Sequence, residues 1–160
     1  MQGKVKVICE NTSSHLEIEM GTTLLELIEM FGIKSEVPLL AAYVNNRLKE
    51  LNYRIFKPLT VCFIDITHFA GYRVYKNTLS FILQKAAHIF NPNRTLHIRH
   101  SIGSGLYCEF ADNQPLTAEQ IAELRGLMQQ IIERAYPIER IRLLTSEVEE
   151  IYRAKGYEDK

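Results

Sequence analysis

The first chemical signal in the chain is a stretch that carries positive charge and no negative charge. No Asp or Glu lies between Asp65 and Glu109, whereas the same stretch holds five Lys or Arg residues and four His residues. Such a local excess predicts a site for a phosphate-bearing ligand, either a nucleotide or an RNA backbone. The residues expected at this anion site are Arg73, Lys76, Lys85, Arg94, His97, Arg99, Ser101 and Ser104.

The spacing of these residues suggests how an anion would be held. Alternation places His97 and Arg99 on one face of a strand, with Leu96 and Ile98 on the other. The turn at 101–105 offers backbone amides that can form an anion nest. The plainer alternative is a solvated strand face followed by an ordinary hairpin, and the sequence leaves both interpretations open.

The other reactive side chains indicate no catalytic site. A nucleophilic cysteine needs a neighbouring base, and none can be named for Cys9, Cys62 or Cys108, so we interpret them as inert packing residues. Glu147 and Glu149 open a predicted helix, where negative charge interacts well with the helix dipole, and are interpreted as capping charges. We therefore expect no catalytic residue, no metal site and no cofactor in this chain.

Hydrophobic periodicity predicts an α+β fold built from two small domains. The first, residues 1–67, has period-2 alternation typical of strands and one helix that begins at a capping box of Thr23 and Glu26. Its expected strands cover 4–9, 15–20, 39–44 and 59–66, the last nearly apolar and therefore central. Residues 68–75 are expected to form a connector, which with Gly71 would permit motion between the domains.

The second predicted domain covers 76–160. An apolar stripe predicts a helix over 78–91, and a capping box of Thr117 and Gln120 opens a longer one that Pro137 ends. Between them, two strands form a hairpin, 96–99 and 106–110. Alternation at 138–144 predicts a further strand, and a short helix capped by Ser146 and Glu149 would turn Val148, Ile151 and Tyr152 inward.

Specific motifs add a family resemblance. Thr23-Leu24-Leu25-Glu26 opening a helix and the turn and strand Ala42–Leu48 resemble the TGS domain, the ubiquitin-like β-grasp module at the front of threonyl-tRNA synthetases, with Asn46 in place of the family's glycine. The stretch Ile102–Phe110 and the segment Tyr136–Arg140 are similar to the start of the editing domain that these enzymes share with alanyl-tRNA synthetases. The resemblance implies that residues 76–160 are a truncated editing-like domain.

The resemblance also implies a missing activity. The family's editing site uses H-x-x-x-H on the first helix of this domain, and ungapped counting places Phe81 and Lys85 at those positions. A benzyl group cannot bind metal or position a water as imidazole does, and a protonated ammonium has no lone pair. The second half of that site, C-x-x-x-H, has no counterpart before Lys160. We therefore expect deacylase editing to be absent.

Three functions follow from the resemblance as alternatives. The first is a non-catalytic N-terminal regulatory region of a bacterial nucleoside (uridine) kinase-like protein, which binds nucleotide, RNA or the kinase domain in cis. ATP and Mg²⁺ would then belong to that downstream domain. The second is a tRNA-binding TGS/editing-like module of a diverged threonyl-tRNA synthetase with deacylase activity lost. The third, ranked last, is a rebuilt deacylase that depends on Lys85 or His88.

The composition limits the binding partners and the cellular compartment that are expected for any of these three functions. The 160 residues carry 19 Lys or Arg and 19 Asp or Glu, so binding of nucleic acid over the whole surface is not expected, and no DNA partner is predicted. The sequence contains no run of 18 apolar residues, so it predicts no membrane-spanning helix. Three widely spaced cysteines exclude a disulfide framework, and we expect a cytoplasmic protein.

Overall fold

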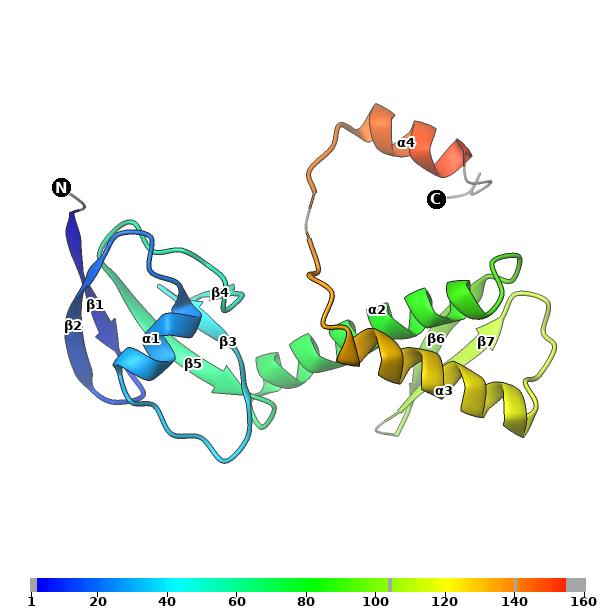
Figure 1. Ribbon diagram of the computed structural model, residues 1–160, viewed down its shortest axis with the longest axis horizontal. Helices are drawn as coiled ribbons and strands as arrows, with labels where there is room; N and C mark the ends of the chain where they lie inside the picture. Colours follow the sequence, from blue (N-terminus) through cyan, green and yellow to red (C-terminus); the bar gives the residue numbers. More distant parts are fainter. Residues whose placement is uncertain (1–2, 104, 140, 155–160) are drawn as a thin grey trace.

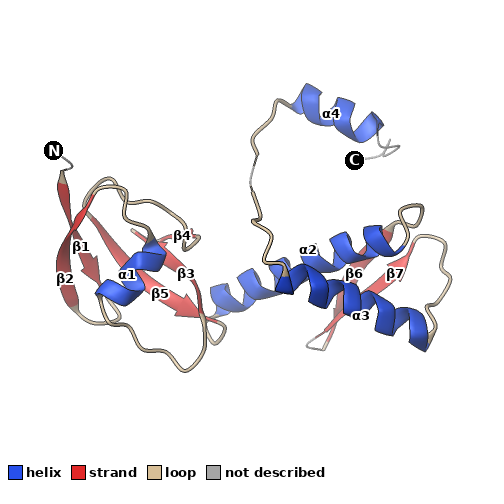
Figure 2. Ribbon diagram, in the orientation of Figure 1, coloured by secondary structure: helices blue, strands red, loops and turns tan. Residues whose placement is uncertain are grey.

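The computed structural model describes residues 3–103, 105–139 and 141–154, and confirms the α+β class. A five-stranded sheet with one short helix is followed by a long helix, a two-stranded hairpin and two further helices (Figures 1 and 2). In chain order the elements are β1 (Lys4–Cys9), β2 (Ser14–Glu19), α1 (Leu24–Met30), β3 (Leu39–Val44), β4 (Arg47–Lys49), β5 (Leu59–Asp65), α2 (Phe69–Phe90), β6 (Leu96–Ile102), β7 (Gly105–Phe110), α3 (Ala118–Glu133) and α4 (Thr145–Ala154).

The first sheet has the mixed topology expected of a β-grasp module. Its strand order is β2-β1-β5-β3-β4, so the nearly apolar β5 is central, as predicted. β5 runs parallel to β1 and antiparallel to β3. The predicted turn between β3 and β4 is confirmed, because Asn45 and Asn46 adopt φ values of 46° and 63°. The short β4 is an addition to the predicted strands.

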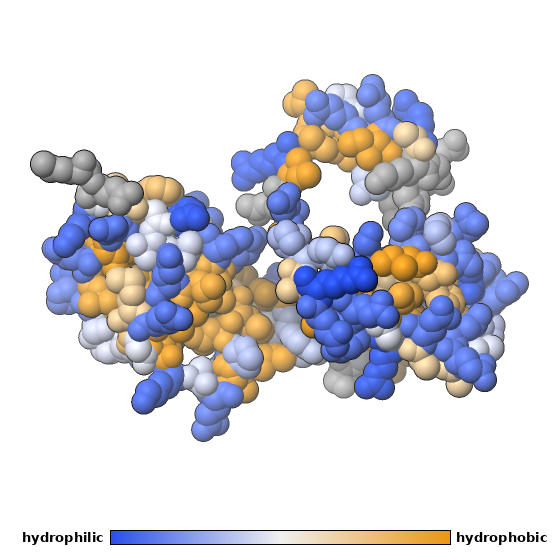
Figure 3. All heavy atoms as spheres, in the orientation of Figure 1, coloured by the Kyte–Doolittle hydropathy of each residue, from blue (hydrophilic) through white to orange (hydrophobic). Residues whose placement is uncertain are grey.

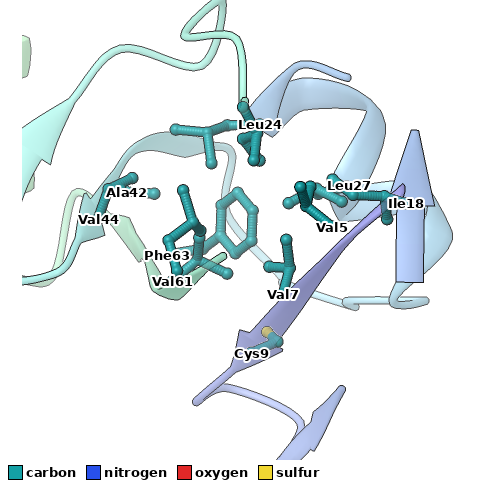
Figure 4. Packing of buried hydrophobic residues seen from close by; sticks show 12 residues of the cluster. Val5, Val7, Cys9, Ile18, Leu24, Leu27, Ala42, Val44, Val61 and Phe63 are labelled. Carbon is teal, nitrogen blue, oxygen red and sulfur yellow. The ribbon is translucent and has the colours of Figure 1, made fainter. Parts of the chain in front are cut away.

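The core of this domain lies between the sheet and α1 (Figure 4). Alternation in β1 sends Val5, Val7 and Cys9 inward, and α1 covers them with Leu24 and Leu27. The predicted capping box at Thr23 is confirmed: the Thr23 hydroxyl accepts from the Glu26 amide, and the Glu26 carboxylate accepts from the Thr23 amide. The hydrogen bonds that the Glu26 carboxylate accepts from the Thr23 amide and the Thr23 hydroxyl lower the pKa of Glu26.

The predicted connector is not an irregular segment. α2 begins at Phe69, nine residues before the predicted start at residue 78, and runs without interruption to Phe90. His68, to which the sequence assigned no role, caps the helix by accepting a hydrogen bond from the Ala70 amide at 3.1 Å. The first turns of α2 then pack on the sheet, where Ala70 is buried with Ala41 and Ile64.

The second domain has its own small core between the helices and the hairpin. Ala86 and Ala87 of α2 meet Leu96 and Phe110 of the hairpin and Leu124 of α3. The predicted capping box at the start of α3 is confirmed, since the Thr117 hydroxyl accepts from the Gln120 amide. Larger, partly buried side chains such as Leu83, Phe90 and Met128 pack around these residues.

The prediction of a strand after α3 was wrong. Residues 138–139 and 141–144 form no strand, because alternation alone provides no partner for backbone pairing; the predicted face residue Arg140 lies outside the described residues. α4 begins at Thr145, and Glu147, rather than Glu149, accepts a hydrogen bond from the Leu144 amide at 2.9 Å. Ile151 and Tyr152, predicted to face inward, are exposed, and Val148 is half-buried.

Candidate functional site

The structure places the predicted anion-site residues in several environments, and the first is an ion pair. The Arg94 guanidinium donates to both Asp112 carboxylate oxygens at 2.7 Å and to the Gln114 carbonyl at 3.0 Å. It also lies over the Phe110 ring, 4.1 Å from the centroid. The hydrogen bonds from Arg94 lower the pKa of Asp112. Arg94 is thus already neutralised, and it braces the loop that follows β7.

A second pair neutralises the outer face of the hairpin. Nε of Arg99 donates to Glu109 at 2.8 Å, and the Tyr107 hydroxyl donates to the same carboxylate at 2.8 Å. These hydrogen bonds lower the pKa of Glu109, and the one from Tyr107 raises the pKa of the Tyr107 phenol. His97 lies opposite Glu109 in the strand register. The face that alternation assigned to His97 and Arg99 therefore carries its own counter-charge.

The cations of α2 have no such counter-charge. Arg73 is exposed and lies 5.8 Å from the Phe69 ring centroid, and Lys76 donates to the Ser101 hydroxyl at 3.4 Å. Among the described residues the only ion pairs are those of Arg94 and Arg99. Arg73, Lys76 and Lys85 thus remain available to an external anion.

The predicted residues do not converge on one site. The structure brings Lys76 to Ser101, and His97 and Arg99 to Glu109. Lys76 and Lys85 are nine residues apart on a helix with 100° per residue, so they lie on opposite sides of α2. Of the turn predicted at 101–105, Ser101 and Ile102 belong to β6 and pair with Leu106 and Gly105 of β7, so these residues continue the hairpin and do not form the predicted amide nest. Ser104 lies outside the described residues.

Phe81 and Lys85, which replace the editing histidines, line one groove. The groove lies between α2 and α3, holds about 1010 Å³ and is otherwise mostly apolar. Phe81 is 59% exposed and Lys85 is also exposed, so both side chains are accessible from the groove. Neither group offers the lone pair with which an imidazole activates a water, because a benzyl group and an ammonium group both lack one. His88, on the same helix, does not line it.

Sequence reasoning missed a small polar cleft on the first domain. Glu10, Tyr43, Asn45, Asn46, Thr60 and Cys62 line about 310 Å³ on the sheet. Burial, followed by a hydrogen bond and charge repulsion from Glu10, raises the pKa of the Cys62 thiol, and burial raises that of Cys108. Both thiols are therefore poor nucleophiles, in keeping with the packing roles inferred from the sequence. The Asn-Asn turn was the available signal for this cleft.

The described ranges of the chain hold neither a cluster of metal ligands nor a membrane-spanning helix. In residues 3–103, 105–139 and 141–154, no three His, Cys, Asp or Glu side chains gather as metal ligands would. No helix of those ranges is both long and apolar enough to span a membrane.

Comparison with known proteins relates the chain to one enzyme class. No protein-family model matches it. It is 26% identical over 140 residues to a threonine–tRNA ligase of Symbiobacterium thermophilum, covering 88% of this chain and 22% of the ligase. A threonine–tRNA ligase of Clostridium kluyveri is 27% identical over 139 residues, 87% of this chain and 22% of the ligase. A threonine–tRNA ligase of Thermotoga neapolitana is 28% identical over 157 residues, which cover 96% of this chain and 24% of the ligase.

The position of the match explains both domains. The chain spans about a fifth of the length of the curated relatives it matches, and the matching part is their N-terminal region. The chain is a distant homologue of the N-terminal region of threonine–tRNA ligases.

Proposed function

We propose that the chain is a tRNA-binding module of the threonyl-tRNA synthetase type that has lost deacylase activity. The observation that carries this proposal is the similarity to the N-terminal region of threonine–tRNA ligases over nearly the whole chain. Phe81 and Lys85 in the groove support the loss of editing, because neither replaces the chemistry of imidazole. The nucleoside-kinase interpretation receives no support from the comparisons.

The charge distribution favours α2 as the surface that contacts RNA. Residues 3–67 carry seven Lys or Arg and eight Asp or Glu, so the first domain has no excess positive charge. α2 carries Arg73, Lys76 and Lys85 and no acidic residue. Arg73 and Lys76 lie one turn apart and are followed in space by the exposed Ser101 of the hairpin. These side chains would contact phosphates and not bases, so binding would depend strongly on salt.

The test is the affinity of the chain for a tRNA(Thr) transcript, measured by fluorescence anisotropy at several salt concentrations. A plot of the logarithm of the binding constant against the logarithm of the salt concentration has a negative slope. Each phosphate contact that is removed should reduce the magnitude of this slope by about one. The double variant R73Q/K76Q should therefore bind more weakly and reduce the slope by about two. No binding at low salt would overturn the proposal.

The matched control removes two charges without changing the net charge. R99Q/E109Q deletes an ion pair in which the cation is already neutralised. Affinity and slope should remain at wild-type values. A loss as large as that of R73Q/K76Q would place the RNA contact on the hairpin instead of on α2.

A separate assay addresses deacylation. Threonine- and serine-charged tRNA should hydrolyse at the same rate with and without the protein. Hydrolysis that is accelerated by the wild type and abolished in K85Q or H88Q would show that a rebuilt deacylase site exists. RNA binding and deacylation are thus tested by different readouts.

A further inference from the structure

The terminal helix α4 exposes an apolar face. None of its ten residues is buried. Leu144, Val148, Ile151 and Tyr152 follow the i, i+4, i+7, i+8 pattern of one helix face, and all but the half-buried Val148 are exposed. An isolated helix of this length is marginal in water, because tertiary packing supplies most helix stability. α4 therefore needs a surface that covers this face.

The groove between α2 and α3 offers such a surface. Its walls are Phe81 and Ile89 of α2, Leu127 and Ile131 of α3, and residues of the segment after α3, including Ile138. Phe81, Ile89 and Ile138 are 59%, 47% and 58% exposed. These exposed side chains do not belong to the small core of the domain, which lies on the hairpin side of α2.

Charge complements this apolar match. At 100° per residue, Glu147 and Glu149 flank Val148 on either side of the apolar face of α4. The groove carries two cations, Lys85 and Arg134, and a single carboxylate, Glu139. The acidic residues of α4 and the net positive charge of the groove lining therefore attract each other.

The connecting segment allows the helix to reach the groove of its own chain. Ten residues, 135–144, separate α3 and its cap from α4, and an extended chain of this length spans up to about 35 Å. The first of these residues already line the groove. In Figure 3 the apolar side of α4 is turned toward the body formed by α2 and α3.

We propose that α4 docks into the groove of its own chain and acts as a strap over Phe81 and Lys85. The strap buries the face of α4 and the exposed wall of the groove together, and sets Glu147 or Glu149 beside Lys85. It closes the place where the sequence has lost its two histidines. This proposal stands apart from RNA binding, which rests on the cations Arg73 and Lys76 at the other end of α2.

The test compares two variants that add the same charge to opposite faces of α4. Ile151→Asp places a carboxylate on the apolar face, and Ser146→Asp places one on the solvent face. Amide hydrogen exchange followed by mass spectrometry reports on the peptides of α4 and of the groove wall 81–89. In the wild type both should be protected, and I151D should accelerate exchange in both by about tenfold or more, because an Ile side chain leaves an apolar site. S146D should match the wild type.

The outcomes separate the possible occupants. Fast exchange of wild-type α4 would show that the helix has no docking surface and would overturn the proposal. So would an I151D effect confined to α4, with the groove peptides unchanged. Protection that grows with protein concentration, together with a dimer in sedimentation velocity, would assign the groove to α4 of a second copy. Ile151 lies outside the cores of the first and the second domain. The melting temperature of the I151D variant should therefore stay close to that of the wild type.

Discussion

Gly71 is the residue at which the long helix meets the first sheet. A Cβ built at this position would overlap the main-chain carbonyl of Asp65. The sequence presents Gly71 as a flexible connector residue, yet in the structure it is buried in the first turn of α2. A glycine that permits close approach of two backbones has the same sequence signature as one that permits motion.

Gly71→Ala should therefore destabilise the protein. The added methyl group meets backbone atoms, which cannot rotate away, so we expect a loss of about 1–3 kcal/mol in the free energy of unfolding. Urea denaturation followed by circular dichroism measures the change. Gly126→Ala in α3 is the matched control, because nothing lies within 4 Å of its Cβ, and it should gain about 0.5–1 kcal/mol. Equal effects of the two substitutions would contradict this account.

Asp112 contributes stability that depends on pH. Its hydrogen bonds from Arg94 hold the folded pKa below the usual 3.8. A carboxyl with a depressed folded pKa stabilises the protein above its unfolded pKa, and this contribution is lost as the pH falls through the folded pKa. D112N should therefore be less stable than the wild type at pH 7, and the difference should vanish in acid below the folded pKa.

Melting temperatures measured from pH 7 down to acid conditions provide the test. Glu123→Gln removes an exposed carboxylate from α3 that forms no ion pair with a described residue. This control should follow the wild-type curve throughout. A D112N curve that runs parallel to the wild type at every pH would show that the Arg94–Asp112 pair is not linked to protonation.

At the scale of the element, α3 has one face that contributes to stability through burial and one that lies in solvent. Leu124 is 8% exposed within the second core, whereas Ile121, one turn earlier, is 54% exposed. Leu124→Ala should cost about 2–5 kcal/mol in unfolding free energy, because it leaves a cavity between α2 and the hairpin. Ile121→Ala should cost well under half of that. Thermal unfolding compares the two, and similar losses would mean that α3 is packed differently.

The elements that could be predicted are those whose signal is local. The capping boxes at Thr23 and Thr117, the alternation of β1 and the nearly apolar run of β5 each lie within a few residues, and each is confirmed. The start of α2 was missed because it packs through Ala70 and Gly71, which leave no apolar stripe. The strand predicted at 138–144 has the right alternation, but its described residues, 138–139 and 141–144, pair with no strand. Pairing is a property of the fold and not of the segment.

The same limit applies to the candidate site. The count of charges between Asp65 and Glu109 is correct, but Arg99 is neutralised by Glu109 at the end of that stretch and Arg94 by Asp112 just beyond it. Cross-strand register brings the former together, and a side chain folded back onto the next loop brings the latter. Phe81 and Lys85, in contrast, were located by ungapped counting against the motif of the family that the chain resembles, and both line one groove.

At the scale of the whole molecule, α2 joins the two domains as one continuous helix. Ala70 and Val74 pack on the first sheet, and Ala86 and Ala87 lie in the second core (Figure 1). The 22 residues span about 33 Å, since each contributes 1.5 Å. The domains are therefore expected to tumble as one body, and NMR relaxation of backbone amides should give the same rotational correlation time for residues 4–65 and 96–133.

Thr78→Pro tests whether the helix itself couples the domains. Thr78 is exposed between the two packed ends of α2, and proline there removes a helix hydrogen bond and clashes with the preceding turn at a cost of about 3 kcal/mol. Both cores lie outside this position, so each domain should keep its fold while the correlation times shorten and diverge. Thr78→Ala, which leaves the backbone intact, should keep the wild-type value. Unequal correlation times already present in the wild type would instead mean that α2 bends in solution, and a phosphate surface on α2 would then not hold a fixed orientation toward the first domain.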